Sequence, residues 1–119
     1  MEIKYHFEYI EKSIEFVLEP NDEVSGYIHN IGGWLHSDVQ CWGEDYISKI
    51  KNVLEGKVEE EFFWGNAYKT LVHKDYTKIT YSYEEDNPKM VPCTLPTEML
   101  YEILQIWTKA REEHYKNKD

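Results

Sequence analysis

The clearest hydrophobic pattern in the chain is a stripe with helical spacing near its end. From Thr97 to about Tyr115, apolar residues recur every three or four positions, and polar residues occupy the opposite face. Pro96 suits a first helical turn, where its missing N–H leaves no hydrogen bond unmade, and Glu98 is favourable near the positive end of the helix dipole. The pattern predicts a long structural helix that covers a β-sheet. The buried face is expected to contain Met99, Leu100, Ile103, Ile106, Trp107, Ala110 and His114.

Alternating apolar and polar positions predict strands in the remainder of the chain. Residues 3–19 alternate on both sides of Glu11-Lys12, which predicts a hairpin with a tight turn. Residues 62–72 and 77–83 alternate in the same way and predict two or three further strands.

One shorter helix is predicted between these strands, from Asp45 to Glu55. Its apolar residues share one face, Asp45 is the expected N-cap, and Gly56 follows at the position where helices often end in glycine. The order of elements predicts an α+β fold in a single domain over residues 1–119. We expect an antiparallel sheet of about five or six strands, with the long C-terminal helix on one face and one shorter helix.

Residues 21–45 have the most unusual composition. They contain five acidic residues, four glycines and two tryptophans, but neither lysine nor arginine. The glycines favour irregular backbone with short strands around 24–30 and 34–41. Acidic groups interleaved with aromatic rings are typical of a binding surface. The alternative is that Trp34 and Trp42 fill the core and the acids are only solvated.

The overall charge changes the range of partners to expect. Net charge is −10, from 23 acidic and 13 basic residues, and aromatic residues reach 15%. Such a chain is expected to repel nucleic acid and anionic membranes and to attract basic partners, unless its acidity serves solubility alone. No apolar run has the length of a membrane span, and the sequence from Met1 to Lys4 lacks the apolar core of a signal peptide. With only Cys41 and Cys93, we expect a cytoplasmic protein with reduced thiols.

The sequence contains few candidate motifs for catalysis or cofactor binding. The nearest approach to a ligand cluster is His36, Asp38 and Cys41, and the glycines at 32–33 lack the lysine that completes a phosphate-binding loop. We therefore expect no metal, no cofactor and no enzymatic activity.

Three stretches resemble a known family. They are Gly32-Gly33-Trp34 followed by an acidic segment, Phe63 to Tyr68 entering a strand, and Leu95 to Leu100 opening the helix that carries Trp107. In these, the chain is similar to the small acidic immunity proteins of bacterial contact-dependent growth inhibition and polymorphic toxin systems. The resemblance implies a tight, non-catalytic inhibitor of one cognate toxin C-terminal domain, often a basic nuclease. It assigns no contact residue.

Charge and aromatic content suggest where such a partner would bind. Acidic residues accelerate association with a basic protein, and Trp or Tyr anchors supply binding energy once desolvated. We expect the protein to be monomeric when unbound. Two alternatives are a generic acidic interaction module and a small hydrolase using His36, Asp38 and Cys41. The predicted partner-binding residues are Trp34, Asp38, Trp42, Glu44 and Asp45, extended by Glu84, Glu85 and Asp86.

Overall fold

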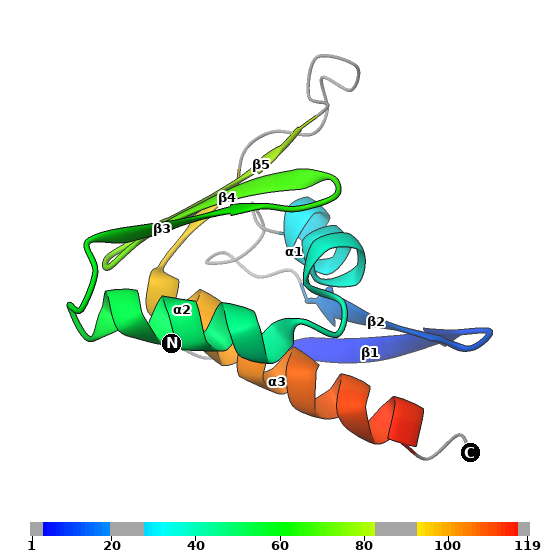
Figure 1. Ribbon diagram of the computed structural model, residues 1–119. Helices are drawn as coiled ribbons and strands as arrows, with labels where there is room; N and C mark the ends of the chain where they lie inside the picture. The colour runs from blue at the N-terminus through cyan, green and yellow to red at the C-terminus, as the bar shows by residue number, and fades with distance from the viewer. Residues whose placement is uncertain (1–3, 20–27, 83–92, 117–119) are drawn as a thin grey trace.

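Six strands form two antiparallel sheets in the computed structural model, which describes residues 4–19, 28–82 and 93–116 (Figure 1). The first sheet is a hairpin of β1 (Tyr5–Ile10) and β2 (Ser13–Leu18). The second has the order β3-β4-β5-β6, with β3 (Glu60–Trp64), β4 (Tyr68–His73), β5 (Thr77–Tyr81) and β6 (Cys93–Leu95).

The helices fill the space beside and between the sheets. In Figure 1 the four-stranded sheet lies above α2 and α3, and α1 lies between that sheet and the hairpin. The helical segments are α1 (Ile28–Trp34), the π-helical turn η2 (Leu35–Val39), α2 (Gly43–Leu54) and α3 (Thr97–Lys116).

The α+β class, the antiparallel pairing and the six strands are confirmed, but the strands are divided between two sheets instead of sharing one. The reason is that α1 lies along the outer edge of β2. A Cβ atom on Gly32 would be 2.8 Å from the carbonyl oxygen of Phe16, so the helix backbone occupies the place where another strand would pair. The hairpin itself forms as predicted, with Glu11 in its turn at φ 57°.

The two short strands expected around 24–30 and 34–41 are wrong where the structure describes them. Residues 28–39 are helical, and residues 24–27 lie outside the described residues. The buried residues of this segment have helical spacing, and the helix persists despite its two glycines because that face is covered completely. They are Ile31, Trp34, Leu35, Asp38 and Val39.

The long C-terminal helix is confirmed. Its buried face packs against α2 and β2, and includes Leu104, which the predicted stripe omitted. At its start the Thr97 hydroxyl donates to the carbonyl oxygen of His73 and lies 2.9 Å from the Thr77 hydroxyl. These contacts fix the first turn of α3 to the β4–β5 turn.

The shorter helix begins two residues before the predicted Asp45, which lies in its first turn while Trp42 holds the N-cap position. Its end is as expected: Gly56 has φ 78°, and the N–H groups of Gly56 and Lys57 donate to the carbonyls of Val53 and Asn52. This pair of bonds is the Schellman arrangement, which directs the chain away from α2 toward β3.

The four-stranded sheet has one buried face and one open face. Phe63, Thr70, Ile79 and Cys93 lie side by side across its strands and are buried against the helices. Buried residues from both sheets and all three α-helices form one hydrophobic cluster. Among the described residues, no helix combines the length and apolar character needed to cross a lipid bilayer.

Candidate functional site

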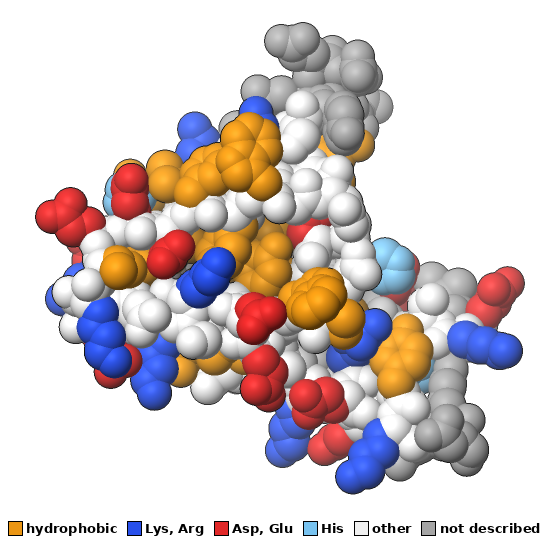
Figure 2. All heavy atoms as spheres, in the orientation of Figure 1, with side chains coloured by type: hydrophobic (Ala, Val, Ile, Leu, Met, Phe, Trp, Pro, Cys, Tyr) orange, Lys and Arg blue, Asp and Glu red, His pale blue; other side chains and the backbone are white. Residues whose placement is uncertain are grey.

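The most distinctive surface feature is a groove between the first half of α2 and strand β3. Its volume is about 460 Å³. Figure 2 shows hydrophobic side chains in the hollow between these elements and charged side chains at its margin. We call it the α2–β3 groove. It is lined by Asp38, Gln40, Trp42, Asp45, Tyr46, Lys49, Phe62, Phe63, Trp64, Gly65 and Asn66.

Three large aromatic side chains on the groove are exposed to solvent. Trp64 is 71% exposed, Trp42 is 59% exposed and Phe62 is 44% exposed. The alternation of β3 explains part of this, because Phe63 points into the core and its neighbours Phe62 and Trp64 must point to the other face. Their rings pack edge to face at 5.2 Å. Contiguous exposed aromatic surface of this kind marks an interaction site more often than isolated exposed residues do.

Charged groups of both signs flank these rings. Glu44 and Asp45, in the first turn of α2, form no ion pair with any described residue, and their position also favours the helix dipole. Two lysines are held against rings instead: Lys49 Nζ lies 5.5 Å from the centre of Phe63, and Lys69 Nζ lies 4.9 Å from the centre of Trp64. Both lysines keep their positive charge in these contacts, so the groove is flanked by charges of both signs, with the two carboxylates at the start of α2.

Asp38 links the two segments that form the floor of the groove, η2 and the β3–β4 turn. Its Oδ1 accepts hydrogen bonds from the Ala67 N–H at 3.0 Å and the Ser37 hydroxyl at 3.1 Å, and its Oδ2 accepts from the Tyr68 N–H at 3.0 Å. Gly65 packs so closely that a Cβ atom there would be 1.8 Å from Oδ2. These bonds clamp the β3–β4 turn onto η2 and so position Trp64 at the rim.

Tyr46 forms the inner wall. Its ring stacks on Phe63 at 4.4 Å and meets the edge of Trp34 at 5.6 Å. Burial, and secondarily the Asp38 carboxylate, raise the pKa of Tyr46 above its ordinary value, and the same two causes raise the pKa of Tyr68. Both phenols are therefore neutral at physiological pH, and the wall of the groove is an uncharged aromatic surface.

The predicted partner-binding residues have different outcomes. Trp42, Glu44 and Asp45 are exposed on or beside the groove, and their role as partner contacts stays a prediction. Trp34 is not a surface residue: it is 0% exposed and its indole N–H donates to Thr70 Oγ1 at 2.8 Å.

Asp38, predicted as a direct contact, is only 7% exposed, and both its oxygens are already bound by backbone N–H groups. It shapes the site without being available to a partner. Glu84, Glu85 and Asp86 lie outside the described residues.

Phe62 and Trp64, which line the groove, are absent from the predicted partner-binding residues. The available signal was the run Phe62-Phe63-Trp64 after three glutamates, because a half-buried strand must expose part of such a run.

The groups considered for catalysis do not assemble. Within the described ranges no three His, Cys, Asp or Glu side chains are placed to hold a metal ion. His36 and Cys41 are exposed, while Asp38 is occupied by backbone amides. Cys93 is buried, and burial raises the pKa of its thiol to about 12, so it is protonated and a poor nucleophile at neutral pH.

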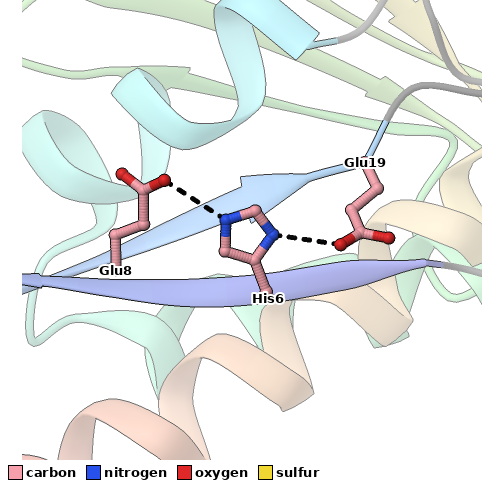
Figure 3. Close-up of polar contacts among 3 residues, drawn as sticks. All are labelled: His6, Glu8 and Glu19. Carbon is pink, nitrogen blue, oxygen red and sulfur yellow. Dashed lines mark hydrogen bonds and ion pairs between the residues drawn. The ribbon is translucent and has the colours of Figure 1, made fainter.

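A second charged cluster lies on the hairpin, away from the groove (Figure 3). The imidazole of His6 lies between two carboxylates, with Nε2 3.2 Å from Glu8 and Nδ1 3.2 Å from Glu19. The hydrogen bond to Glu8, followed by that to Glu19, raises the pKa of His6 above its ordinary value. These three side chains are each about half exposed, and none of them lines the α2–β3 groove, in which we place the candidate site.

Comparison of the chain with protein-family models, with curated proteins and with solved structures finds no significant match.

Proposed function

We propose that the protein is an immunity protein that binds and neutralises a cognate toxin domain through the α2–β3 groove. The observation that carries the proposal is the pair of tryptophans on the groove, Trp42 at 59% and Trp64 at 71% exposure, beside unpaired carboxylates in a chain of net charge −10. Large exposed indoles are costly to leave in water and are the residues most enriched among binding hot spots.

The toxin domain in this proposal is basic, and a nuclease is the best candidate. A surface that is negative overall attracts a nucleic-acid-binding protein over long range and competes with the phosphates that such an enzyme binds. Burial of the two indoles then slows dissociation. The protein acts by binding alone, in the cytoplasm, without a cofactor and as a monomer before it meets the toxin.

The test is protection against the toxin domain encoded beside this gene. Co-expression should restore growth of cells that make the toxin domain, and calorimetry should give a dissociation constant of about 10 nM or lower. A neighbouring toxin that is neither bound nor neutralised would reject the proposal and favour a generic interaction module.

The groove is tested by removing one ring at a time. Trp64→Ala and Trp42→Ala should each weaken toxin binding by about thirtyfold or more, the effect of losing a hot spot of about 2 kcal/mol. Tyr9→Ala is the matched control, because Tyr9 is 63% exposed on β1 and does not line the groove. It should change affinity by less than about threefold. Equal losses for all three variants would place the binding surface elsewhere.

The charge contribution is tested separately through association rates. Reversing Glu44 and Asp45 to lysine together should slow association by about tenfold at low salt and by less at high salt. Reversing the exposed residues Glu102 and Glu113 on α3 changes the net charge equally and is the control. If both pairs slow association equally, total charge and not the groove steers the partner.

A further inference from the structure

Strand β3 is the outer edge of the four-stranded sheet, and its register tells which of its backbone groups point outward. Gly65 N–H donates to the Tyr68 carbonyl at 3.0 Å, so that pair is hydrogen-bonded across the ladder. In an antiparallel pair, hydrogen-bonded and non-hydrogen-bonded positions alternate. Phe63, opposite Thr70, therefore bonds to β4, whereas the N–H and C=O groups of Phe62 and Trp64 point away from the sheet.

Within the described residues, nothing in the fold covers these outward groups. The comparable edge of β2 is occupied by α1, as the close approach of Gly32 to Phe16 shows. At β3, α2 packs beneath the strand, and no hydrogen bond from any described residue reaches the outward N–H of Phe62 or Trp64. Proteins usually protect such an edge with a bulge, a proline or a covering segment. The first two residues of this edge are charged glutamates, whereas its second half carries two exposed aromatic side chains, Phe62 and Trp64.

We propose that a basic, extended segment of the partner pairs with this edge as a fifth strand, so that recognition includes backbone hydrogen bonds as well as the aromatic rim. The inference rests on the proposed function and specifies how the partner is held. Strand addition of this kind draws affinity from main-chain hydrogen bonds and specificity from side chains at alternate positions. Here the added strand would lie beside the rings of Phe62 and Trp64, with the α2–β3 groove next to it.

The charge around the edge identifies the chemistry of the added strand. Glu59, just before β3, and Glu61, within it, form no ion pair with described residues, and Asp45 lies across the groove. The two lysines nearby lie over the rings of Phe63 and Trp64. A strand with lysine or arginine at alternate positions is complementary to these carboxylates.

A second copy of this chain is a poor occupant. It would bring another glutamate-rich β3 and another ten negative charges to the same edge.

The direct test is amide hydrogen exchange by NMR on the complete chain, with the toxin domain as the probe. When unbound, the amides of Phe62 and Trp64 should exchange much faster than that of Phe63. On binding, Phe62 and Trp64 should gain at least tenfold protection while Phe63 changes little. A toxin domain that binds tightly and leaves both amides unprotected would overturn the inference and leave the proposed function standing.

A proline substitution tests the same bond by affinity. Phe62→Pro removes an outward N–H without removing a bond to β4, and edge positions of this kind tolerate proline. Phe62→Ala loses the ring but keeps the N–H. We expect Phe62→Pro to bind at least tenfold more weakly than Phe62→Ala, and equal affinities of the two folded variants would contradict the inference. If the proline variant does not fold, Trp64→Pro against Trp64→Ala gives the same comparison, and the exchange experiment on the unmodified chain needs neither.

A defined peptide separates this inference from the identity of the toxin. A seven-residue peptide of alternating lysine and valine, at millimolar concentration, should protect Phe62 and Trp64, and the same peptide with glutamate in place of lysine should not. This result would support a basic-strand site even if no toxin were neutralised. Equal protection by both peptides would overturn the assignment of a basic partner. Protection that rises with protein concentration alone would also overturn it, and would identify another copy of the chain as the occupant.

Discussion

The four tryptophans form two pairs with opposite environments, one in the core and one on the α2–β3 groove. Trp34 and Trp107 are 0% and 1% exposed, and each indole N–H has an acceptor, Thr70 Oγ1 at 2.8 Å and the Gln40 carbonyl at 3.3 Å. Trp42 and Trp64 are mostly exposed, and among the described residues neither indole N–H has an acceptor. A buried indole needs a partner for its N–H, whereas an exposed one leaves that donor available to another molecule. The contrast separates residues that hold the fold from residues that remain available for recognition.

The largest effect should follow from removing a core ring. Trp34→Ala should lower the free energy of unfolding by about 3–5 kcal/mol, because it leaves a cavity and strands the Thr70 hydroxyl. Trp42→Ala should change it by no more than about 0.5 kcal/mol. Urea denaturation followed by circular dichroism measures both. Similar losses for the two variants would break the distinction between the pairs.

The next effect concerns the hydrogen bonds by which Asp38 joins η2 to the β3–β4 turn. Asp38→Ala leaves the part-buried N–H of Ala67 and the buried N–H of Tyr68 without acceptors and should cost about 2–3 kcal/mol of stability. Asp38→Asn keeps one carbonyl acceptor and should cost less. Gly65→Ala should also disrupt this contact, because the added Cβ would be 1.8 Å from Asp38 Oδ2. Denaturant midpoints compare the three, and an Asp38→Ala variant as stable as the unmodified protein would show that the clamp is not needed.

A smaller effect should appear at high pH, where Tyr46, which contacts Trp34 and lines the groove, loses its phenolic proton. The pKa of Tyr46 is higher in the folded state than the ordinary value of about 10. Its stabilising contribution is complete below that value and is lost as pH rises through the folded pKa, because the unfolded chain ionises first. Stability should therefore fall above about pH 10. Replacing Tyr46 by phenylalanine should make the decline shallower in thermal melts, and an unchanged slope would assign the decline to other groups.

The smallest effect is expected at the exposed hairpin cluster. Replacing Glu8 and Glu19 by glutamine should lower the pKa of His6 toward 6.5, its value without such partners. NMR titration of the imidazole protons measures the shift. Because the cluster is solvent-exposed, the thermal midpoint should stay within about 1–2 °C. A pKa that does not move would mean that neither carboxylate contacts the imidazole in solution.

Much of the fold follows from periodicity in the sequence. The alternation around Glu11 and in residues 68–81, together with the stripe from Thr97, specifies strands and helix correctly, because one face of each element is buried. The strand prediction for residues 28–39 is wrong because it gives more weight to the glycines than to the helical spacing of the residues around them. The split into two sheets follows from that same helix, which occupies the edge of β2, so it could not be predicted once the helix was missed.

Only some residues of the candidate site can be predicted from the sequence, because the exposure of the others depends on tertiary packing. Trp42, Glu44 and Asp45 flank the start of a recognisable helix, and such positions are commonly exposed. Trp34 and Trp42 have similar local composition, and only tertiary packing places one inside and the other outside. The place of Trp64 on the groove depends on β3 being an edge strand, and strand order is not encoded in any local pattern.

The burial of Cys93 has a practical consequence for labelling. With its thiol enclosed and its pKa raised to about 12, Cys93 is inert to maleimides at neutral pH, whereas Cys41 is exposed and adjacent to Trp42. The sequence therefore already contains one reactive cysteine, Cys41, next to Trp42 on the α2–β3 groove. A fluorophore attached to Cys41 would report occupancy of the groove by its change in emission, with no cysteine introduced or removed.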